Sequence, residues 1–393
     1  MAKQSLRDKT DVGIFRRILN ALIKYVFIFI ALCSILVIID GYIPLLFRKY
    51  YLHTYKSLTV EDGDEFEKQI RDAAYNLIES ESWGAKPMAG SNSLFKYILN
   101  KSLSNSNVMD YGEFGYLLHY TFLYAEKRDD QAMMTLIKEK FDKYWLNDSN
   151  LSRIDQTTYG NVALDLYLRT HQHKYKVVAD KFCAYLDSLD RLDGIILYPS
   201  NKIEQDVDGI GLVSPFLFYY SDVFKSSRAQ SMAVRMVEDF VKWGADPITG
   251  IPCQTYDIRN HIKKRHVNWG RGTSWYLLGV SQLVTKDSLI SKRVEVLDST
   301  LLKLDTYYFT HYLGQQGLPD MSATIPILYY LNTKKYIKLS KDQLAEILSP
   351  YIDHEGVIRF GSPSISFPHD DVNALTTNLF CQGLLLYFLS EIN

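Results

Sequence analysis

The segment NWGRGTSWYLLGV, residues 268–280, joins a cluster of Trp, Arg and Gly to the beginning of an apolar stretch. That stretch, TSWYLLGVSQLV at 273–284, carries apolar residues on nearly all sides of a helix. A helix that is apolar all round belongs in a protein interior, and amphipathic helices cover it. The segment therefore predicts a buried helix whose first turn carries Arg271 between Trp269 and Trp275.

Helices of this kind recur along the chain and alternate with amphipathic ones. Five further segments are apolar almost all round: 113–125, 159–168, 211–220, 322–331 and 375–389. Four segments have a single apolar face: 63–80, 127–145, 174–189 and 228–243. Because the alternation repeats about every fifty residues, we predict an all-α fold, an (α/α)6 barrel made of six helical hairpins. An open array of hairpins would leave a similar pattern.

The predicted inner helices begin at polar residues. These are Asp110, Asp155, Asp208, Arg271, Asp320 and the pair Asp370 and Asp371. If the hairpins are parallel repeats, all of them meet at one end of the barrel. Asp is a preferred N-cap and suits the positive end of the helix dipole, so capping explains part of the pattern. The same dipole disfavours an arginine, and we therefore expect Arg271 to meet an anion.

The N-terminus departs from this pattern. Residues 25–47 are almost continuously apolar and long enough to span a bilayer. A basic flank precedes them, which favours the cytoplasmic side; it consists of Lys3, Arg7, Lys9, Arg16, Arg17 and Lys24. We predict a cytoplasmic tail at 1–24, an uncleaved transmembrane anchor at 25–47 and the barrel at 48–393, in the periplasm or outside the cell. A buried N-terminal helix is the alternative.

Composition excludes several classes of protein. The 44 Lys and Arg nearly balance the 45 Asp and Glu, which argues against nucleic-acid binding. The four cysteines have no metal-site spacing, and a single Cys183–Cys253 bridge is the one disulfide that we consider. The sequence has no phosphate loop, dinucleotide fingerprint or HExxH motif, so we expect neither cofactor nor metal.

An arginine and aromatic rings together suggest a ligand. The guanidinium fork matches a carboxylate, and Trp or Tyr rings can stack on sugars, so a uronic acid satisfies both. The loop before residue 268 adds a basic cluster that could attract an acidic oligo- or polysaccharide. It consists of Arg259, His261, Lys263, Lys264, Arg265 and His266. A solvated surface loop without such a role would carry the same residues.

Several segments also resemble one family of enzymes. DPITGIPCQTYD (246–257) followed by NWGRGTSWYLLGV looks like the DPxTGLFYHxxD and WGRGNGWxxxAL signature of glycoside hydrolase families 88 and 105. RIDQTTYGNVALDLYLRT, DVDGIGLVSPFL and PDMSATIPILYYL resemble further family segments in order and spacing. These families are the unsaturated glucuronyl and rhamnogalacturonyl hydrolases, built as six-hairpin barrels. The resemblance runs from about residue 110 to the C-terminus.

The resemblance implies a chemistry and residue roles. Family enzymes hydrate a 4,5-unsaturated uronic acid at the non-reducing end, and the product rearranges to break the glycosidic bond. The motif places the proton-donating acid on Asp208, and Asp155 matches the position of a second functional acid. Substrate binding falls to Arg271, Trp269, Trp275, Gln254 and Asp320.

This sequence also departs from the family pattern around the acid. Asp206 and Gly209 stand where the family has Trp and Asp, and Gln254 replaces a His. Gln156 replaces an acid, and Thr273 and Ser274 interrupt the WGRGNGW motif. Since supporting residues set the pKa of the acid and the position of the substrate, the substrate itself stays open.

Three functions fit these observations. The first is a membrane-anchored hydrolase of uronic-acid-containing glycans, and the second is a divergent barrel that trims or modifies a nascent cell-surface polysaccharide. The third is a catalytically silent glycan-binding protein, against which the presence of both Asp208 and Arg271 counts. The sequence does not predict the oligomeric state.

Overall fold

The structure is a computed structural model, and it describes most of the 393 residues. Described are residues 2–82, 94–95, 98, 108–146, 151–197, 203–265, 268–283, 288–304, 306–361 and 377–392. The chain divides into two compact units, Met1–Thr54 with Lys86–Asn105, and Tyr55–Ala85 with Ser106–Asn393. Asp370 and Asp371, which we expected at the entry of the last helix, lie outside the described residues.

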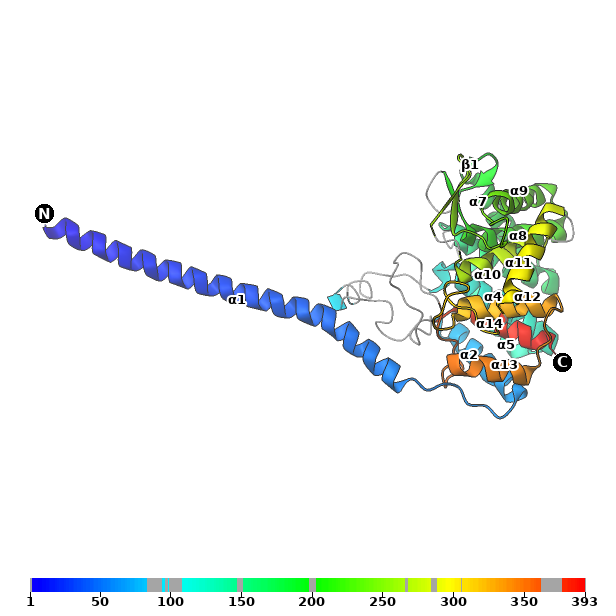
Figure 1. Cartoon of the computed structure of the whole chain (residues 1–393), viewed down its shortest axis with the longest axis horizontal. Coiled ribbons are helices and arrows are strands. Elements are labelled where there is room, and N and C mark those ends of the chain that lie inside the picture. The colour runs from blue at the N-terminus through cyan, green and yellow to red at the C-terminus, as the bar shows by residue number, and fades with distance from the viewer. Residues whose placement is uncertain are drawn as a thin grey trace. The chain divides into compact units, whose positions relative to one another are not determined.

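The first unit is dominated by one helix, α1 (Ala2–Thr54) (Figure 1). Its stretch Leu19–Thr54 is long and apolar enough to cross a membrane, and none of its most apolar window is buried by protein. The predicted span 25–47 lies inside this stretch. The helix does not end at Phe47, however, because it continues to Thr54, and Pro44 lies within it.

Six inner helices form the centre of the second unit. They are α4 (Gly112–Arg128), α6 (Tyr159–Thr170), α8 (Val207–Phe224), α10 (Gly270–Val280), α12 (Met321–Thr333) and α14 (Leu379–Glu391). Each packs against the next in this order, and α14 packs against α4, which closes the ring. Their buried side chains belong to one continuous hydrophobic core. The predicted all-α barrel is therefore confirmed, and the open array is not what the chain forms.

Six outer helices cover this ring. They are α2 (Gly63–Glu79), α5 (Gln131–Trp145), α7 (His173–Ser188), α9 (Ser227–Trp243), α11 (Ser288–Lys303) and α13 (Lys341–Leu348). The sequence predicts the first four of these helices, but it predicts neither α11 nor α13. The core face of α11 is a narrow stripe of Ile290, Val294, Leu297 and Leu301, and α13 is only eight residues long. A short helix and a narrow stripe both give a weak periodic signal.

Short strands and turns lie between the helices. A two-stranded antiparallel sheet pairs β1 (Arg191–Leu192) with β2 (Ile195–Ile196). A three-stranded antiparallel sheet has the order β3 (Glu204–Asp206), β4 (Thr255–Asp257) and β5 (Ile262–Lys264). Asp206 pairs with Thr255, which pairs with Lys264. Three 3-10 turns complete the fold: η1 (Val108–Asp110), η2 (Ile154–Thr158) and η3 (Ser349–Tyr351). Since β3 runs directly into α8, this sheet lies where the inner helices begin.

Helices α8 and α10 approach closely at Gly211. A Cβ atom there would lie 2.7 Å from the carbonyl oxygen of Trp275, so only glycine fits. Pro215, one turn later in α8, has no N–H to bond the Gly211 carbonyl. The hydroxyl of Tyr116 in α4 donates to that carbonyl instead. One tyrosine thus completes the backbone hydrogen bonding of a neighbouring helix.

Replacing Tyr116 with Phe is expected to lower the free energy of unfolding by about 1–3 kcal/mol, because the buried Gly211 carbonyl loses this donor. Tyr276→Phe is the matched control. Its hydroxyl is buried without a hydrogen-bond partner among the described residues, so its removal should leave stability unchanged or raise it. Chemical denaturation followed by circular dichroism measures both variants. Equal losses would contradict the assignment.

The four cysteines are all free thiols. Cys183 lies in α7, and Cys253 is buried beside β4. The Cys183–Cys253 bridge that the sequence left open is not formed.

Candidate functional site

Three charged residues from three inner helices meet where these helices begin. Glu113, Asp208 and Arg271 lie in the first turns of α4, α8 and α10. Arg271 forms an ion pair with Glu113 through Nη2, and both side chains are mostly buried. The anion that we expected for Arg271 is therefore present within the protein. The sequence predicts Asp110 at this helix entry, whereas Glu113, three residues later, is the residue that reaches Arg271.

Arg271 rests on an aromatic stack. Its guanidinium carbon lies 5.6 Å from the ring centroid of Trp275. Trp275 stacks in turn on Phe380, with ring centroids 4.8 Å apart and planes 26° apart, and on Tyr116 at 6.1 Å. Cation–π contact and packing therefore hold the guanidinium in place.

Neither tryptophan offers an open face to a sugar. Trp275 is only 2 % exposed because Phe380 and Tyr116 pack against its ring. Trp269 is 3 % exposed, and its ring lies against Gly272 at the start of α10. We therefore correct the sequence-based interpretation: these rings position Arg271 and the first turn of α10 instead of stacking on substrate.

Asp208 has the properties of an acid that holds its proton near neutral pH. Burial raises its pKa to about 7, while Arg271 works in the opposite direction. The negative charges of Asp206 and Glu113 add to the rise, and Arg265 opposes it. Burial disfavours the charged form of a carboxyl group, so desolvation dominates this balance. Asp208 does not cap α8, whose N-cap residue is Asp206.

Asp206, the last residue of β3, and Arg265, directly after β5, lie near Asp208. The hydroxyl of Thr255 donates to Asp206, and Arg265 lies 3.9 Å from the same carboxylate. Burial raises the pKa of Asp206, although Thr255 and Arg265 lower it. Glu204 accepts from Lys264 at 2.8 Å. The sheet thus brings the carboxylates of Glu204 and Asp206 to the start of α8, where Lys264 and Arg265 balance only part of their negative charge.

The carboxylate of Asp155 binds Arg153 and the start of α4. Arg153 binds both of its carboxylate oxygens at 2.9 Å. The backbone N–H of Gly112, the first residue of α4, donates to it at 3.4 Å. A Cβ atom on Gly112 would collide with the backbone of Asp155. These contacts fix the start of α4, so Asp155 positions Glu113 indirectly, and its carboxylate is occupied by Arg153.

The remaining predicted residues are buried polar groups. Asp320 is fully buried and caps α12 through the N–H of Ser322, with His311 3.5 Å away. Its charge still acts on Arg271: burial works to lower the pKa of this arginine, but the negative charges of Glu113, Asp208 and Asp320 raise it. Gln254 is 4 % exposed, and its backbone carbonyl accepts from the N–H of Val207 beside Asp208. Capping therefore accounts for Asp320, as the sequence allowed.

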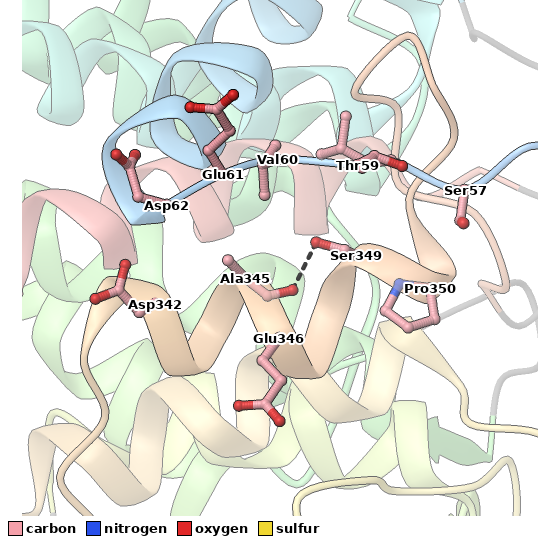
Figure 2. Close-up of a pocket in the computed structure, with 11 residues that line it drawn as sticks. Ser57, Thr59, Val60, Glu61, Asp62, Asp342, Ala345, Glu346, Ser349 and Pro350 are labelled. Carbon is pink, nitrogen blue, oxygen red and sulfur yellow. Dashed lines mark hydrogen bonds between the residues drawn. The ribbon is translucent and has the colours of Figure 1, made fainter.

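A separate groove lies away from these residues. It has a volume of about 400 Å³ and runs between the extended residues 57–62 and α13 (Figure 2). Its carboxylates are Glu61, Asp62, Asp342 and Glu346. Two of them hold helix ends, since Asp62 caps α2 and Asp342 accepts from the N–H of Gly63. None of the predicted site residues lines this groove. Among the described residues, no cluster of His, Cys, Asp and Glu is suited to a metal ion.

Comparison with known proteins identifies the family. The sequence pattern of Glycosyl Hydrolase Family 88 matches residues 94–300, more than half of the chain. The chain belongs to this family. Among curated proteins, none matches the chain.

Solved structures agree with this family 88 assignment at the level of fold. A possible member of the GH105 family from Salmonella enterica has a TM-score of 0.65 at 17 % identity, covering 85 % of this chain and 94 % of that one. A possible GH105 member from Klebsiella pneumoniae has a TM-score of 0.64 at 14 % identity, covering 84 % and 92 %. A glycosyl hydrolase family 88 protein from Bacteroides vulgatus has a TM-score of 0.58 at 14 % identity, covering 84 % and 99 %. Family 88 membership makes the chain a glycoside hydrolase by family.

Proposed function

We propose that this family 88 member hydrolyses glycans that end in a 4,5-unsaturated uronic acid, with Asp208 as the proton donor. The observation that carries the proposal is that Asp208, a carboxyl group of pKa about 7, lies within electrostatic reach of Arg271, a mostly buried arginine on the neighbouring helix α10. A general acid works best when its pKa lies near the operating pH. The arginine supplies the binding partner that a uronic acid needs.

The Arg271–Glu113 ion pair supports recognition of an acidic sugar. Glu113 is a carboxylate that already lies on the guanidinium, which is itself supported by Trp275. A uronate carboxylate has the same charge and planar geometry, so it would share or compete for the same group. Binding there would place the sugar ring beside Asp208.

These positions support the hydration of the sugar double bond. The carboxylic acid of Asp208 would give its proton to one carbon of the sugar double bond, and a water molecule would add to the other carbon. The proton released by that water returns to the carboxylate of Asp208. The hydrated product then rearranges and breaks the glycosidic bond. Glu113, which lies on Arg271 and whose charge raises the pKa of Asp208, is better placed than Asp155 to act as the second carboxylate.

Anchoring by α1 is part of the proposal. The helix is apolar over a length sufficient for a bilayer, and the basic residues precede its apolar part. The barrel would then face the periplasm or the cell exterior. A membrane-held barrel that trims a nascent polysaccharide is the second candidate, favoured by this same helix.

The test uses the full chain in detergent with a panel of unsaturated uronyl disaccharides. The ultraviolet absorbance of the C4=C5 double bond should disappear as the substrate is hydrated. A folded protein that leaves the absorbance of the whole panel unchanged would favour the polysaccharide-trimming candidate instead.

The pH dependence of kcat/KM should report Asp208. The protonated acid is the active form, so activity is full below pH 7 and falls about tenfold per pH unit above it. If the proton donor were an ordinary carboxyl group, this fall in activity, the alkaline limb of the pH profile, would begin near pH 4. A rate that is constant up to pH 9 would exclude Asp208 as the proton donor.

A further inference from the structure

Trp243 and His261 form a flat aromatic stack at the same end of the barrel as Asp208. Trp243 is the last residue of α9, and outer helices end where the following inner helix begins. The two rings lie 3.9 Å apart with planes only 8° from parallel. Trp243 is partly exposed and His261 is exposed, so the outer face of the imidazole points away from the indole into solvent.

The turn that carries His261 is held rigidly. The backbone N–H groups of Arg259 and Asn260 both donate to the carboxylate of Asp257, and the N–H of His261 donates to the carbonyl of Asp257. His261 itself has a left-handed backbone, with φ of 55°. Few non-glycine residues adopt this conformation, and histidine is among the residues that adopt it more often. The position of the imidazole on Trp243 is therefore built into the turn.

Two exposed isoleucines lie on the segments next to this stack in the chain. Ile248, in the loop after α9, is 83 % exposed, and Ile262 in β5 is 56 % exposed. Lys263 joins strand and loop, because its ammonium lies 3.6 Å from Asp246. We call Trp243, His261, Ile248 and Ile262 the Trp243 platform. Exposed apolar side chains grouped among charged ones mark a binding surface.

Strand β5 connects this platform to the acid. Lys264 lies opposite Thr255, which lies opposite Asp206. His261 precedes Lys264 by three residues, so its backbone is on the order of 14 Å from that of Asp206 by strand geometry. That separation is longer than a single sugar ring. Lys263 and Lys264 of β5 and Arg265 directly after it follow this path. Each already contacts a carboxylate of the protein, and the carboxylates of an acidic chain would share these cations.

We propose that the Trp243 platform is a distal subsite for an acidic oligosaccharide whose terminal residue reaches Asp208. The apolar face of a sugar ring packs on the platform, and Lys263, Lys264 and Arg265 accompany the carboxylates between the two points. The preferred ligand is therefore a chain of several uronic-acid residues, longer than a disaccharide. This inference rests on the proposed function for the position of the terminal sugar.

Calorimetry with saturated galacturonic-acid oligomers of two, four and six residues tests the subsite. These oligomers have no double bond to hydrate, so binding is measured apart from turnover. For the full chain in detergent, the affinity should rise about tenfold from the shortest to the longest oligomer, the contribution of one aromatic contact. Trp243→Ala should remove this gain and leave disaccharide binding unchanged, while Trp243→Phe should keep most of it.

The matched control is Val177→Ala, an apolar residue on α7 that is 51 % exposed; it should retain the full gain with length. An unchanged length dependence in Trp243→Ala would overturn the subsite, as would an affinity of the unmodified chain that does not depend on length. A change in oligomeric state of Trp243→Ala without a change in affinity would identify the platform as a contact between protein molecules and would also overturn it. Length-dependent binding without hydration of unsaturated substrates would keep the subsite and refute the proposed reaction.

Discussion

Asp208→Asn is expected to lower kcat/KM on unsaturated uronides by about a thousandfold, the usual contribution of a general acid. The amide has the shape of the carboxyl group but has no acidic proton to give. The variant should fold normally, because burial disfavours the charged form that the amide removes. Its thermal unfolding temperature above pH 7 should therefore equal or exceed that of the unmodified protein. Loss of activity with unchanged stability assigns the proton to Asp208.

Asp206→Asn is the control for this first prediction. Asp206 lies in β3, and its negative charge helps to raise the pKa of Asp208. Removing that charge should lower the pKa of Asp208, so the alkaline limb of the pH profile moves to lower pH while the maximal rate changes little. An Asp206 variant as inactive as Asp208→Asn would show that the proton donor had been assigned to the wrong carboxyl group.

Arg271→Ala should reduce kcat/KM by about a hundredfold to a thousandfold, equivalent to 3–4 kcal/mol lost with the partner of a buried charge pair. Most of the effect should be a higher KM, because the guanidinium binds the substrate carboxylate. The variant should also shift the pH profile. Arg271 lowers the pKa of Asp208, so its removal moves the alkaline limb to higher pH. A purely structural role for Arg271 would change stability without this shift.

Two further variants separate binding from stability. Arg271→Lys keeps the positive charge but loses the planar, bidentate guanidinium. Compared with Arg271→Ala, it should regain more of the stability than of the affinity for substrate. The double variant Arg271→Ala with Glu113→Ala removes the carboxylate that Arg271→Ala leaves unpaired. It should recover the stability lost in the single variant but not the activity. Recovery of activity in the double variant would mean that Arg271 serves only to neutralise Glu113.

The sequence by itself determined the barrel and pointed to the two residues that we propose at the centre of the site. The alternation of apolar and amphipathic helices can be predicted from the hydrophobic pattern, because the faces of a helix that are buried must carry apolar residues. Asp208 and Arg271 stand out because a charged residue in the first turn of an apolar helix is visible in the chain itself. The long apolar helix at the N-terminus is readable for the same reason.

Only the tertiary structure decided which groups surround these two. Glu113 and Asp110 are both acids at one helix entry, and the direction of the first turn alone brings Glu113 to Arg271 and Asp110 to Tyr144. Asp155 matched a family position, yet Arg153, two residues away, occupies its carboxylate. Trp275 is buried because Phe380, more than a hundred residues later, packs on its ring. Such contacts depend on how distant helices meet, and periodicity carries no information about that.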